Sequence, residues 1–337
     1  MRAFALTGPR QFEVRDEPDP VAGPGQVVVH IERVGVCGTD VEFFTGEMSY
    51  LHTGRAAYPM RLGHEWSGTV TSVGDGVDPA WLGRRTTGDT MLGCGRCDRC
   101  LSGRHHVCAE LVEVGISGGF AGALAERLAV PASALHALPD AVDAVSGALV
   151  EPGGNALRAL DAASLAAGDR LLVMGPGTIG LLTAQFAHAA GIEVHVLGLP
   201  LPALEFAKGF GFAGVWTDAD LPLLPWDAVI DASNAAALPS RAVELVEPGR
   251  RVVFIGLAGA PSLVDSRSIA LKDVTAVGIL GASAGLDGTI DRFASGAVDP
   301  RTLVAATVGL ERAGDVLGGW RPTDAGAGPK IHIDPRL

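Results

Sequence analysis

The chain has 337 residues, of which 47% are hydrophobic and 19% are charged, and its formal net charge is −12. This composition supplies enough apolar material for two folded domains and is too poor in charge for intrinsic disorder. The acidic balance argues against a broad basic surface for nucleic acid or for an anionic membrane. No apolar run reaches the roughly 18 residues that a membrane span needs.

The N-terminal segment MRAFALTGPRQFEV has a short apolar patch followed by charged residues, which is unlike a secretory signal. We therefore expect a cytoplasmic protein. In that reducing compartment, clustered cysteines are more often metal ligands than disulfides.

The first half of the chain is rich in Val, Gly and Pro, and its short runs, such as GQVVVHIERVG and WSGTVTSVG, predict a twisted, barrel-like β domain. Cys37 follows the first run in VGVCGTD, and His64 and Glu65 occupy a glycine-flanked turn in RLGHEWSGTV. Glu151 comes later, before a proline in ALVEPGGN. A lone cysteine is typical of a small core residue, and a lone histidine of a packed or surface position. Together, these residue types are the ligands of a catalytic zinc, which keeps a fourth position open.

Four of the five cysteines lie in one polar stretch, CGRCDRCLSGRHHVC. Cys94, Cys97, Cys100 and Cys108 have the spacing C-x2-C-x2-C-x7-C, which can surround Zn²⁺ with four thiolates and leave no open position. A closed site of this kind stabilises an irregular lobe. Disulfides and an iron–sulfur cluster are the alternatives. We predict a structural zinc.

The segment DRLLVMGPGTIGLLTAQFAHAAG opens the second half with an apolar strand at 171–174 and a helix that runs to Gly191. Between them lies the turn Gly175-x-Gly177-x-x-Gly180. In this strand–turn–helix context, the glycines permit a tight turn, close approach of a pyrophosphate and packing of helix on strand. Backbone N–H groups at the start of the helix then bind the phosphates.

Further strands are predicted at 193–198, 214–216, 227–233, 251–256 and 274–280, with helices at 204–210 and 238–246 between them. Nearly continuous apolar strands that alternate with helices predict a doubly wound parallel sheet, a Rossmann domain of the α/β class. The tail GPKIHIDPRL predicts one more strand, which we expect to return to the first domain.

With these motifs in place, the sequence resembles the zinc-containing medium-chain dehydrogenases over essentially its whole length. The resemblance rests on VCGTD, GHEWSG, the cysteine lobe, the Glu-Pro pair, GPGTIG, PGRRVVFIG and KDVTAVG. The Glu-Pro and GHE motifs resemble the sorbitol, threonine and sugar dehydrogenase branch, and GHEWSG with TTGDTMLGCGRC resembles dehydrogenases of cyclitols and aminocyclitols. The resemblance implies a Rossmann domain at 151–285 and a β-rich GroES-like catalytic domain at 1–150 and 286–337, with a structural zinc lobe at about 90–110.

The resemblance also implies roles for individual residues. Cys37, His64 and Glu151 would bind the catalytic zinc, and Glu65 would either exchange into the ligand set or support it. Asp40 would orient the histidine, and Thr39 would pass on the substrate proton. The implied contacts to NAD or NADP, with a slight preference for NAD, are Gly175, Pro176, Gly177, Thr178, Ile179, Gly180, Gly198, Leu199, Ser233 and Gly256.

Three departures from the family pattern stand out. A relay histidine after the cysteine motif is absent, and Glu42 lies in its neighbourhood. Gly153 and Gly154 replace bulky residues after the Glu-Pro pair, and we expect them to open the substrate or cofactor cleft. Gly198 stands where an acid normally binds the adenosine ribose. We therefore expect modest discrimination between NAD and NADP, and we expect Gly198→Asp to favour NAD.

The sequence thus predicts an enzyme with two zinc ions per chain that moves hydride between a nicotinamide cofactor and a secondary alcohol, such as a polyol, sugar, cyclitol or aminocyclitol. Threonine or a simple secondary alcohol is the alternative substrate. A non-catalytic nucleotide sensor and a zinc-ribbon nucleic-acid binder are alternatives from other classes, and both are disfavoured by the full set of motifs. We expect a small-molecule partner, no nucleic acid or membrane partner, and a homodimer or homotetramer paired through VTAVGIL, because an exposed apolar edge strand invites pairing.

Overall fold

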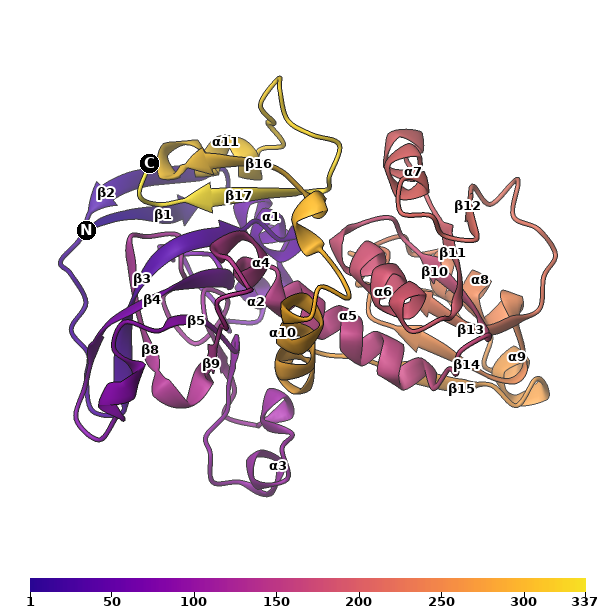
Figure 1. Cartoon of the computed structure of the whole chain (residues 1–337), viewed down its shortest axis with the longest axis horizontal. Helices are drawn as coiled ribbons and strands as arrows, with labels where there is room; N and C mark the ends of the chain where they lie inside the picture. The colour runs from indigo at the N-terminus through magenta and orange to yellow at the C-terminus, as the bar shows by residue number, and fades with distance from the viewer.

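The computed structural model describes residues 1–337. Its two large sheets lie on either side of a long central helix, α5 (Figure 1). No strand pairs across the two sheets. This arrangement confirms the predicted fold class, a parallel Rossmann-like sheet next to a separate β-rich unit. The domain limits inferred from the sequence stay a prediction.

The β-rich unit contains a seven-stranded sheet in the order β16-β17-β3-β4-β5-β9, with β8 paired to β3. Strands from both ends of the chain meet in it, because β17 runs antiparallel to β3 and parallel to β16. The predicted strand in the tail is therefore present and lies beside the first long strand of the chain. The bounds are β3 (Gln26–Gly35), β4 (Glu65–Val73), β5 (Arg85–Gly88), β8 (Arg127–Pro131), β9 (Leu135–Ala137), β16 (Val304–Gly309) and β17 (Lys330–Asp334).

Smaller elements surround this sheet. A hairpin joins β1 (Arg2–Gly8) to β2 (Gln11–Asp16), and a short ladder joins β6 (Met91–Leu92) to β7 (Val112–Glu113). The helices of this unit are short: α1 (Gly38–Thr45), α2 (Ser49–His52), α3 (Asp98–Leu101), α4 (Ala144–Ala148) and α11 (Ala313–Leu317). Its core is one cluster of 24 buried residues, which includes side chains of both β3 and β17 and so joins the two ends of the chain.

The second sheet is wholly parallel, in the order β12-β11-β10-β13-β14-β15. Alternate residues of β10 enter different cores: Leu171 and Val173 pack on one face, and Leu172 and Met174 on the other. A strand buried on both faces must be apolar at every position, which explains the continuous run in the sequence. The strands are β10 (Arg170–Met174), β11 (Glu193–Leu197), β12 (Gly214–Trp216), β13 (Trp226–Asp231), β14 (Val246–Phe254) and β15 (Thr275–Gly278).

Helices cover this sheet: α5 (Val150–Ala163), α6 (Thr178–Ala189), α7 (Leu201–Lys208), α8 (Leu238–Leu245), α9 (Ser266–Leu271) and α10 (Leu286–Ala294). Helix α7 begins three residues before its predicted start. The helix includes Pro202, which lies in its first turn, where the missing N–H has no partner to lose.

Two glycines of α5, Gly153 and Gly154, have a different role from the one expected from the sequence. A Cβ at Gly153 would lie 2.5 Å from Cγ2 of Thr289 on α10, and one at Gly154 would lie 2.9 Å from Cβ of Ala282. The expectation that these glycines open a cleft is wrong. They allow α5 to pack closely against α10 and the turn before it.

No helix combines the length and the apolar character needed to cross a membrane.

Candidate active site

The predicted ligands Cys37 and His64 meet because their strands are neighbours. Cys37 follows β3 and is the N-cap residue of α1, and His64 immediately precedes β4. Strands β3 and β4 are antiparallel with Gly35 opposite Glu65, so the end of one strand lies beside the start of the other. One ligand atom from each of Cys37, His64 and Glu65 lies within 4.8 Å of the others.

The side chain of Asp40 contacts both Cys37 and His64. One carboxylate oxygen accepts a hydrogen bond from the backbone N–H of Cys37 at 2.9 Å, and the other lies 3.5 Å from Nδ1 of His64. Burial alone lowers the pKa of His64, but the charges of Asp40 and Cys37 outweigh it, and the pKa lies well above its ordinary value. With Nδ1 directed at Asp40, the other ring nitrogen is the one available to a metal.

Lys330 is a site residue that the sequence analysis missed. Its Nζ donates hydrogen bonds to both carboxylate oxygens of Glu65, at 2.9 and 2.7 Å, and to the carbonyl oxygen of Val36 at 3.0 Å. Both side chains are buried, and Gly35 leaves room for the pair, because a Cβ there would lie 2.2 Å from Glu65 Oε2. The available signal was a lysine at the start of the predicted strand in the tail, where it alternates with the isoleucines of KIHID.

Glu151 approaches from the other side, in the first turn of α5. It is not part of the cluster within 4.8 Å, and its Oε1 accepts a hydrogen bond of 2.9 Å from Asn155 Nδ2. Burial raises its pKa to about 7; the charge of Glu65 adds to the rise, and that of His64 opposes it. Thr39 is half-buried in the first turn of α1, two residues after Cys37.

The donor set fits a zinc ion. A sulfur, an imidazole nitrogen and carboxylate oxygens are the ligands that Zn²⁺ takes in catalytic sites. Around them the carboxyl groups of Asp40, Glu65 and Glu151 are all buried, and Lys330 is the buried cation paired with one of them. Buried carboxylates need nearby cations to stay ionised, so a divalent cation would balance the charge of this site.

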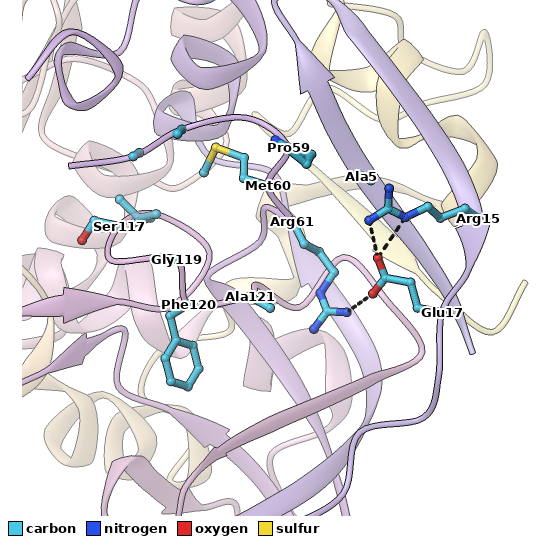
Figure 2. Close-up of a pocket in the computed structure, with 13 residues that line it drawn as sticks. Ala5, Arg15, Glu17, Pro59, Met60, Arg61, Ser117, Gly119, Phe120 and Ala121 are labelled. Atoms are coloured by element: carbon cyan, nitrogen blue, oxygen red, sulfur yellow. Dashed lines mark hydrogen bonds and ion pairs between the residues drawn. The ribbon is translucent and has the colours of Figure 1, made fainter. Parts of the chain in front are cut away.

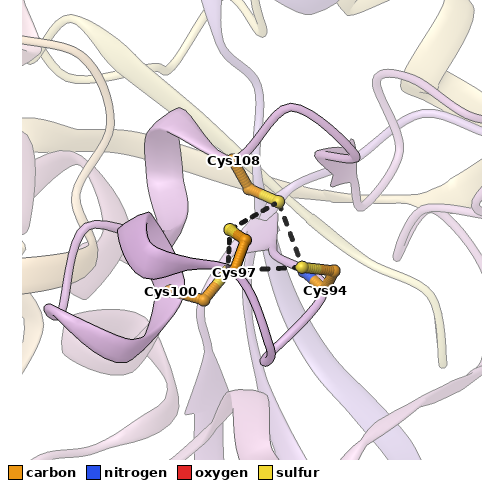
Figure 3. A group of neighbouring side chains, drawn as sticks. All are labelled: Cys94, Cys97, Cys100 and Cys108. Atoms are coloured by element: carbon orange, nitrogen blue, oxygen red, sulfur yellow. Dashed lines mark hydrogen bonds between the residues drawn. The ribbon is translucent and has the colours of Figure 1, made fainter.

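The four clustered cysteines also lie together, as Figure 3 shows. Their sulfur atoms are separated by 3.6 Å between Cys97 and Cys100, 3.8 Å between Cys97 and Cys108, and 3.9 Å between Cys94 and Cys100. These distances are too long for disulfides. Four sulfurs at ~2.3 Å from one zinc ion would be separated by about 3.8 Å, the edge of the tetrahedron. The geometry therefore fits a four-thiolate zinc.

Two cysteines of the lobe differ in pKa, because burial raises the pKa of Cys100 to about 12 while backbone groups favour the ionised form of Cys94. N–H groups of Arg96 and Cys97 lower the pKa of Cys94 to about 6. The lobe is anchored next to the cysteines as well: His105 lies 2.7 Å from Asp89, and Ser283, from the segment after β15, donates a 3.0 Å hydrogen bond to the same carboxylate.

The predicted cofactor residues lie at the carboxyl ends of the parallel strands, where nucleotides bind in sheets of this kind. Residues 175–177 join β10 to α6, and Gly198, Ser233 and Gly256 follow β11, β13 and β14. Gly175 has φ +109° and Gly180 packs with its Cα against the Gly175 carbonyl, so a side chain at either position would clash. Gly177, at the N-cap of α6, is exposed, which leaves the helix start open to an anion.

A separate cavity of about 210 Å³ lies on the β-rich unit, between the first hairpin and the loop at 116–121 (Figure 2). Arg15 and Arg61 both pair with Glu17 at its edge, at 2.8 and 3.1 Å. Its lining contains neither Cys37, His64 nor Glu65, and its three charged residues, Arg15, Arg61 and Glu17, are paired with one another. We do not regard it as the active site.

Two family models match the chain: the alcohol dehydrogenase GroES-like domain over residues 23–140 and the zinc-binding dehydrogenase over residues 178–295. A sorbitol dehydrogenase of Halalkalibacterium halodurans is 30% identical over 294 residues, which are 82% of this chain and 83% of that protein. An L-threonine 3-dehydrogenase of Saccharopolyspora erythraea is also 30% identical, over 83% of this chain and 84% of its own.

Solved structures of dehydrogenases have the same fold as this chain. An Escherichia coli alcohol dehydrogenase complexed with NADH has a TM-score of 0.90 and 25% identity, with 99% of both chains covered. A zinc-binding dehydrogenase of Sinorhizobium meliloti bound to NADP has a TM-score of 0.89 and 27% identity, again with 99% of both chains covered.

Fold, site and relatives together define a zinc- and nicotinamide-dependent oxidoreductase. The chain belongs to the zinc-containing medium-chain dehydrogenase family, and it moves hydride between a secondary alcohol and a nicotinamide cofactor. The resemblance stated from the sequence is thereby confirmed.

Proposed function

We propose that this chain is a polyol-type dehydrogenase whose catalytic zinc is held by Cys37, His64 and Glu151. The observation that carries the proposal is the approach of the Cys37, His64 and Glu65 ligand atoms to within 4.8 Å of one another, with the Glu151 carboxyl facing the same charges. Glu151 would bind the metal through a carboxylate oxygen, and the hydrogen bond from Asn155 Nδ2 to its Oε1 orients the carboxyl group.

When bound, zinc supplies Lewis acidity toward the substrate oxygen, and the nicotinamide takes up the hydride. The chain's own residues orient the metal ligands and carry the substrate proton away from the site. Asp40 accepts a hydrogen bond from the backbone N–H of Cys37 with one oxygen, and the other oxygen lies 3.5 Å from Nδ1 of His64, close enough to attract an imidazolium. Thr39 accepts the substrate proton and passes it toward solvent.

Glu65 is the residue whose role is least direct. Both of its oxygens are bonded to Lys330, which favours a charge-balancing role next to the zinc over permanent ligation. Exchange of Glu65 into the ligand set would require Lys330 to release at least one oxygen.

The substrate class follows from the relatives, whose names include sorbitol dehydrogenase and D-xylulose reductase. We assign polyols, sugars, cyclitols or aminocyclitols to this chain. L-threonine and simple secondary alcohols form the second candidate, because a threonine dehydrogenase matches at the same identity. Assays of all these alcohols with NAD and with NADP, read at the absorbance of the reduced cofactor, decide between them. Turnover of none of them would contradict the proposal.

A second zinc belongs to the cysteine lobe, so metal analysis should find two ions per chain. The spacing of the four sulfurs supports this count. We place the protein in the cytoplasm, where reduced cysteines of this kind persist.

The cofactor contacts follow from the strand ends. The α6 N-terminus binds the pyrophosphate through residues 175–180, and Gly198, Leu199, Ser233 and Gly256 line the remainder. NAD is slightly preferred, and NADP is also used.

A homodimer or homotetramer forms through β15, the edge strand of the parallel sheet, whose residues Thr275, Ala276 and Gly278 are exposed. An exposed edge strand offers unpaired N–H and C=O groups to a second copy. Light scattering at micromolar concentration tests this, and a monomer mass would contradict it.

A further inference from the structure

The adenosine end of the proposed cofactor site lacks charged groups. Gly198 follows β11 and donates its N–H to the carbonyl oxygen of Trp216 at 3.1 Å. Next to it, Leu199 and Leu201 are 70% and 60% exposed, and the first turn of α7 contains no acidic residue. A carboxylate at the end of this strand normally binds the ribose hydroxyls, and a nearby arginine normally binds a 2′-phosphate.

The neighbouring charges are already paired with one another. Asp218, which follows β12, accepts a 3.0 Å hydrogen bond from Arg241. Lys208, at the far end of α7, pairs with Glu205 at 2.5 Å. The third of these acids, Asp220 after β12, accepts a 2.8 Å hydrogen bond from Thr217. These elements therefore offer no free cation to the apolar end of β11.

A steric contact explains why residue 198 is glycine. A Cβ placed there would lie 2.2 Å from Cδ and 3.0 Å from Cγ of Pro176. Real Cβ atoms do not approach so closely. The φ angle of Gly198 lies outside the left-handed region that favours glycine, so the backbone itself would tolerate a side chain. The ring of Pro176 is what excludes it.

The proline cannot easily move away. The residue before it, Gly175, donates its N–H to the carbonyl oxygen of Leu197 at 2.8 Å, which fixes the phosphate loop to the last residue of β11. Pro176 itself is buried. Any side chain at 198 would therefore push on the loop that binds the pyrophosphate. On this geometry we expect Gly198→Asp alone to disturb that loop, in contrast to the sequence-based expectation that it favours NAD.

We propose that Pro176 is the residue that sets cofactor selectivity: its ring keeps position 198 free of any side chain and so keeps the ribose pocket uncharged toward both NAD and NADP. This inference rests on the proposed cofactor site. It adds a physical cause, the Pro176 ring, for the way that site treats NAD and NADP. Removing the ring creates room for an acid, and only then does an acid discriminate, by binding the ribose hydroxyls and repelling a 2′-phosphate.

The test uses six proteins: the wild type, P176A, G198D, P176A/G198D and, as uncharged steric controls, G198A and P176A/G198A. NADH and NADPH binding is measured by fluorescence titration of the purified protein, and folding by circular dichroism. We expect G198D and G198A each to weaken both cofactors by about tenfold or more, because a Cβ 2.2 Å from the Pro176 ring forces the phosphate loop to shift. P176A adds no charge, so it should change the affinities for NADH and NADPH by the same factor and leave their ratio at the wild-type value.

The double variants separate sterics from charge. P176A/G198D should recover NADH binding by about tenfold over G198D and raise the NADH/NADPH affinity ratio by about tenfold over the wild type. P176A combined with G198A should recover both cofactors equally, with no change in that ratio.

Two results would overturn the role of Pro176: G198D alone binding NADH more tightly than the wild type, or P176A/G198D binding no better than G198D. Failure of the wild type to bind either cofactor would instead contradict the proposed cofactor site itself. The two failures are therefore distinguishable in one set of titrations.

Discussion

The two clusters of metal-ligand residues in this molecule are built in opposite ways. The cysteine lobe takes all four sulfurs from residues 94–108, and its fold is mostly irregular, with α3 and a 3₁₀ turn at 105–107. The catalytic cluster takes Cys37, His64 and Glu65 from two adjacent strands, and it depends on Lys330 from the last strand of the chain. One set of ligands is local in sequence, and the other exists only after the β-rich sheet has formed.

This difference predicts different consequences of damage. A closed four-thiolate site acts through stability, because the metal replaces a core that the lobe does not have. The open site acts through chemistry, and the sheet around it is already held by 24 buried side chains. Variants at the two sites should therefore lose different zinc ions and different properties.

The largest effect is expected for His64→Ala. Loss of the imidazole removes a ligand from the open site, and kcat/KM should fall by about a thousandfold or more, equivalent to ~4 kcal/mol of transition-state stabilisation. Metal analysis should find one zinc per chain in place of two, with the melting temperature little changed. Activity within tenfold of the wild type would rule out the ligand assignment.

Cys100→Ser should produce the complementary result. One of four ligands is lost from the closed site, so the lobe zinc should dissociate and the free energy of unfolding should fall by about 3–5 kcal/mol. Urea denaturation and zinc content measure this. The comparison fails if the variant keeps two zinc ions and wild-type stability.

Lys330→Met tests the part of the catalytic cluster that comes from the tail. The substitution leaves the Glu65 carboxylate buried without its partner, which should destabilise the protein by about 3 kcal/mol. The double variant Glu65→Gln/Lys330→Met should recover most of that stability, because no buried charge is left unpaired. Equal stability of the single and double variants would show that the pair is not coupled.

The smallest effect concerns acid stability of the same strand. His332 on β17 is fully buried with no hydrogen-bond partner at either nitrogen, and burial, with the charges of Lys330 and Arg33, lowers its pKa to about 3. An unfolded histidine takes up a proton near pH 6.5, so its contribution to stability is present above that pH and is lost as the pH falls toward 3. This group alone should cost about 2 kcal/mol between pH 7 and pH 5.

His332→Phe provides the matched control, because it keeps a buried ring that cannot titrate. Chemical denaturation at pH 7 and pH 5 should show a smaller loss of stability in the variant than in the wild type. Identical losses would mean that His332 is not the group that titrates.

Several features were predictable because their cause is local in sequence. The thiolate cluster needs only a short loop, and the phosphate loop needs only a strand, a glycine turn and a helix, so the sequence identified both. The strands of the parallel sheet were equally clear, because burial on both faces requires an apolar residue at every position. Element ends were less exact, as at α7, which begins at Leu201 and not at the predicted residue 204.

Other features depend on which distant residues come into contact, and periodicity and spacing carry no signal for them. Lys330 and Glu65 are 265 positions apart in the sequence. They pair because β17 adds to the sheet beside β3. Gly153 and Gly154 could be interpreted as an opening or as a close contact, and only the position of α10 decided for the contact.

The sequence by itself therefore determined the family, the fold class and the close grouping of the four cysteines, and it identified candidate ligands for a catalytic zinc that stay a prediction. Tertiary structure decided how the charges of that cluster are balanced and why position 198 has no side chain. The physical reason is the same in both cases. Chemical type and local geometry are properties of short segments, whereas the pairing of a buried charge and the exclusion of a Cβ by Pro176 depend on atoms that only folding brings within a few ångströms.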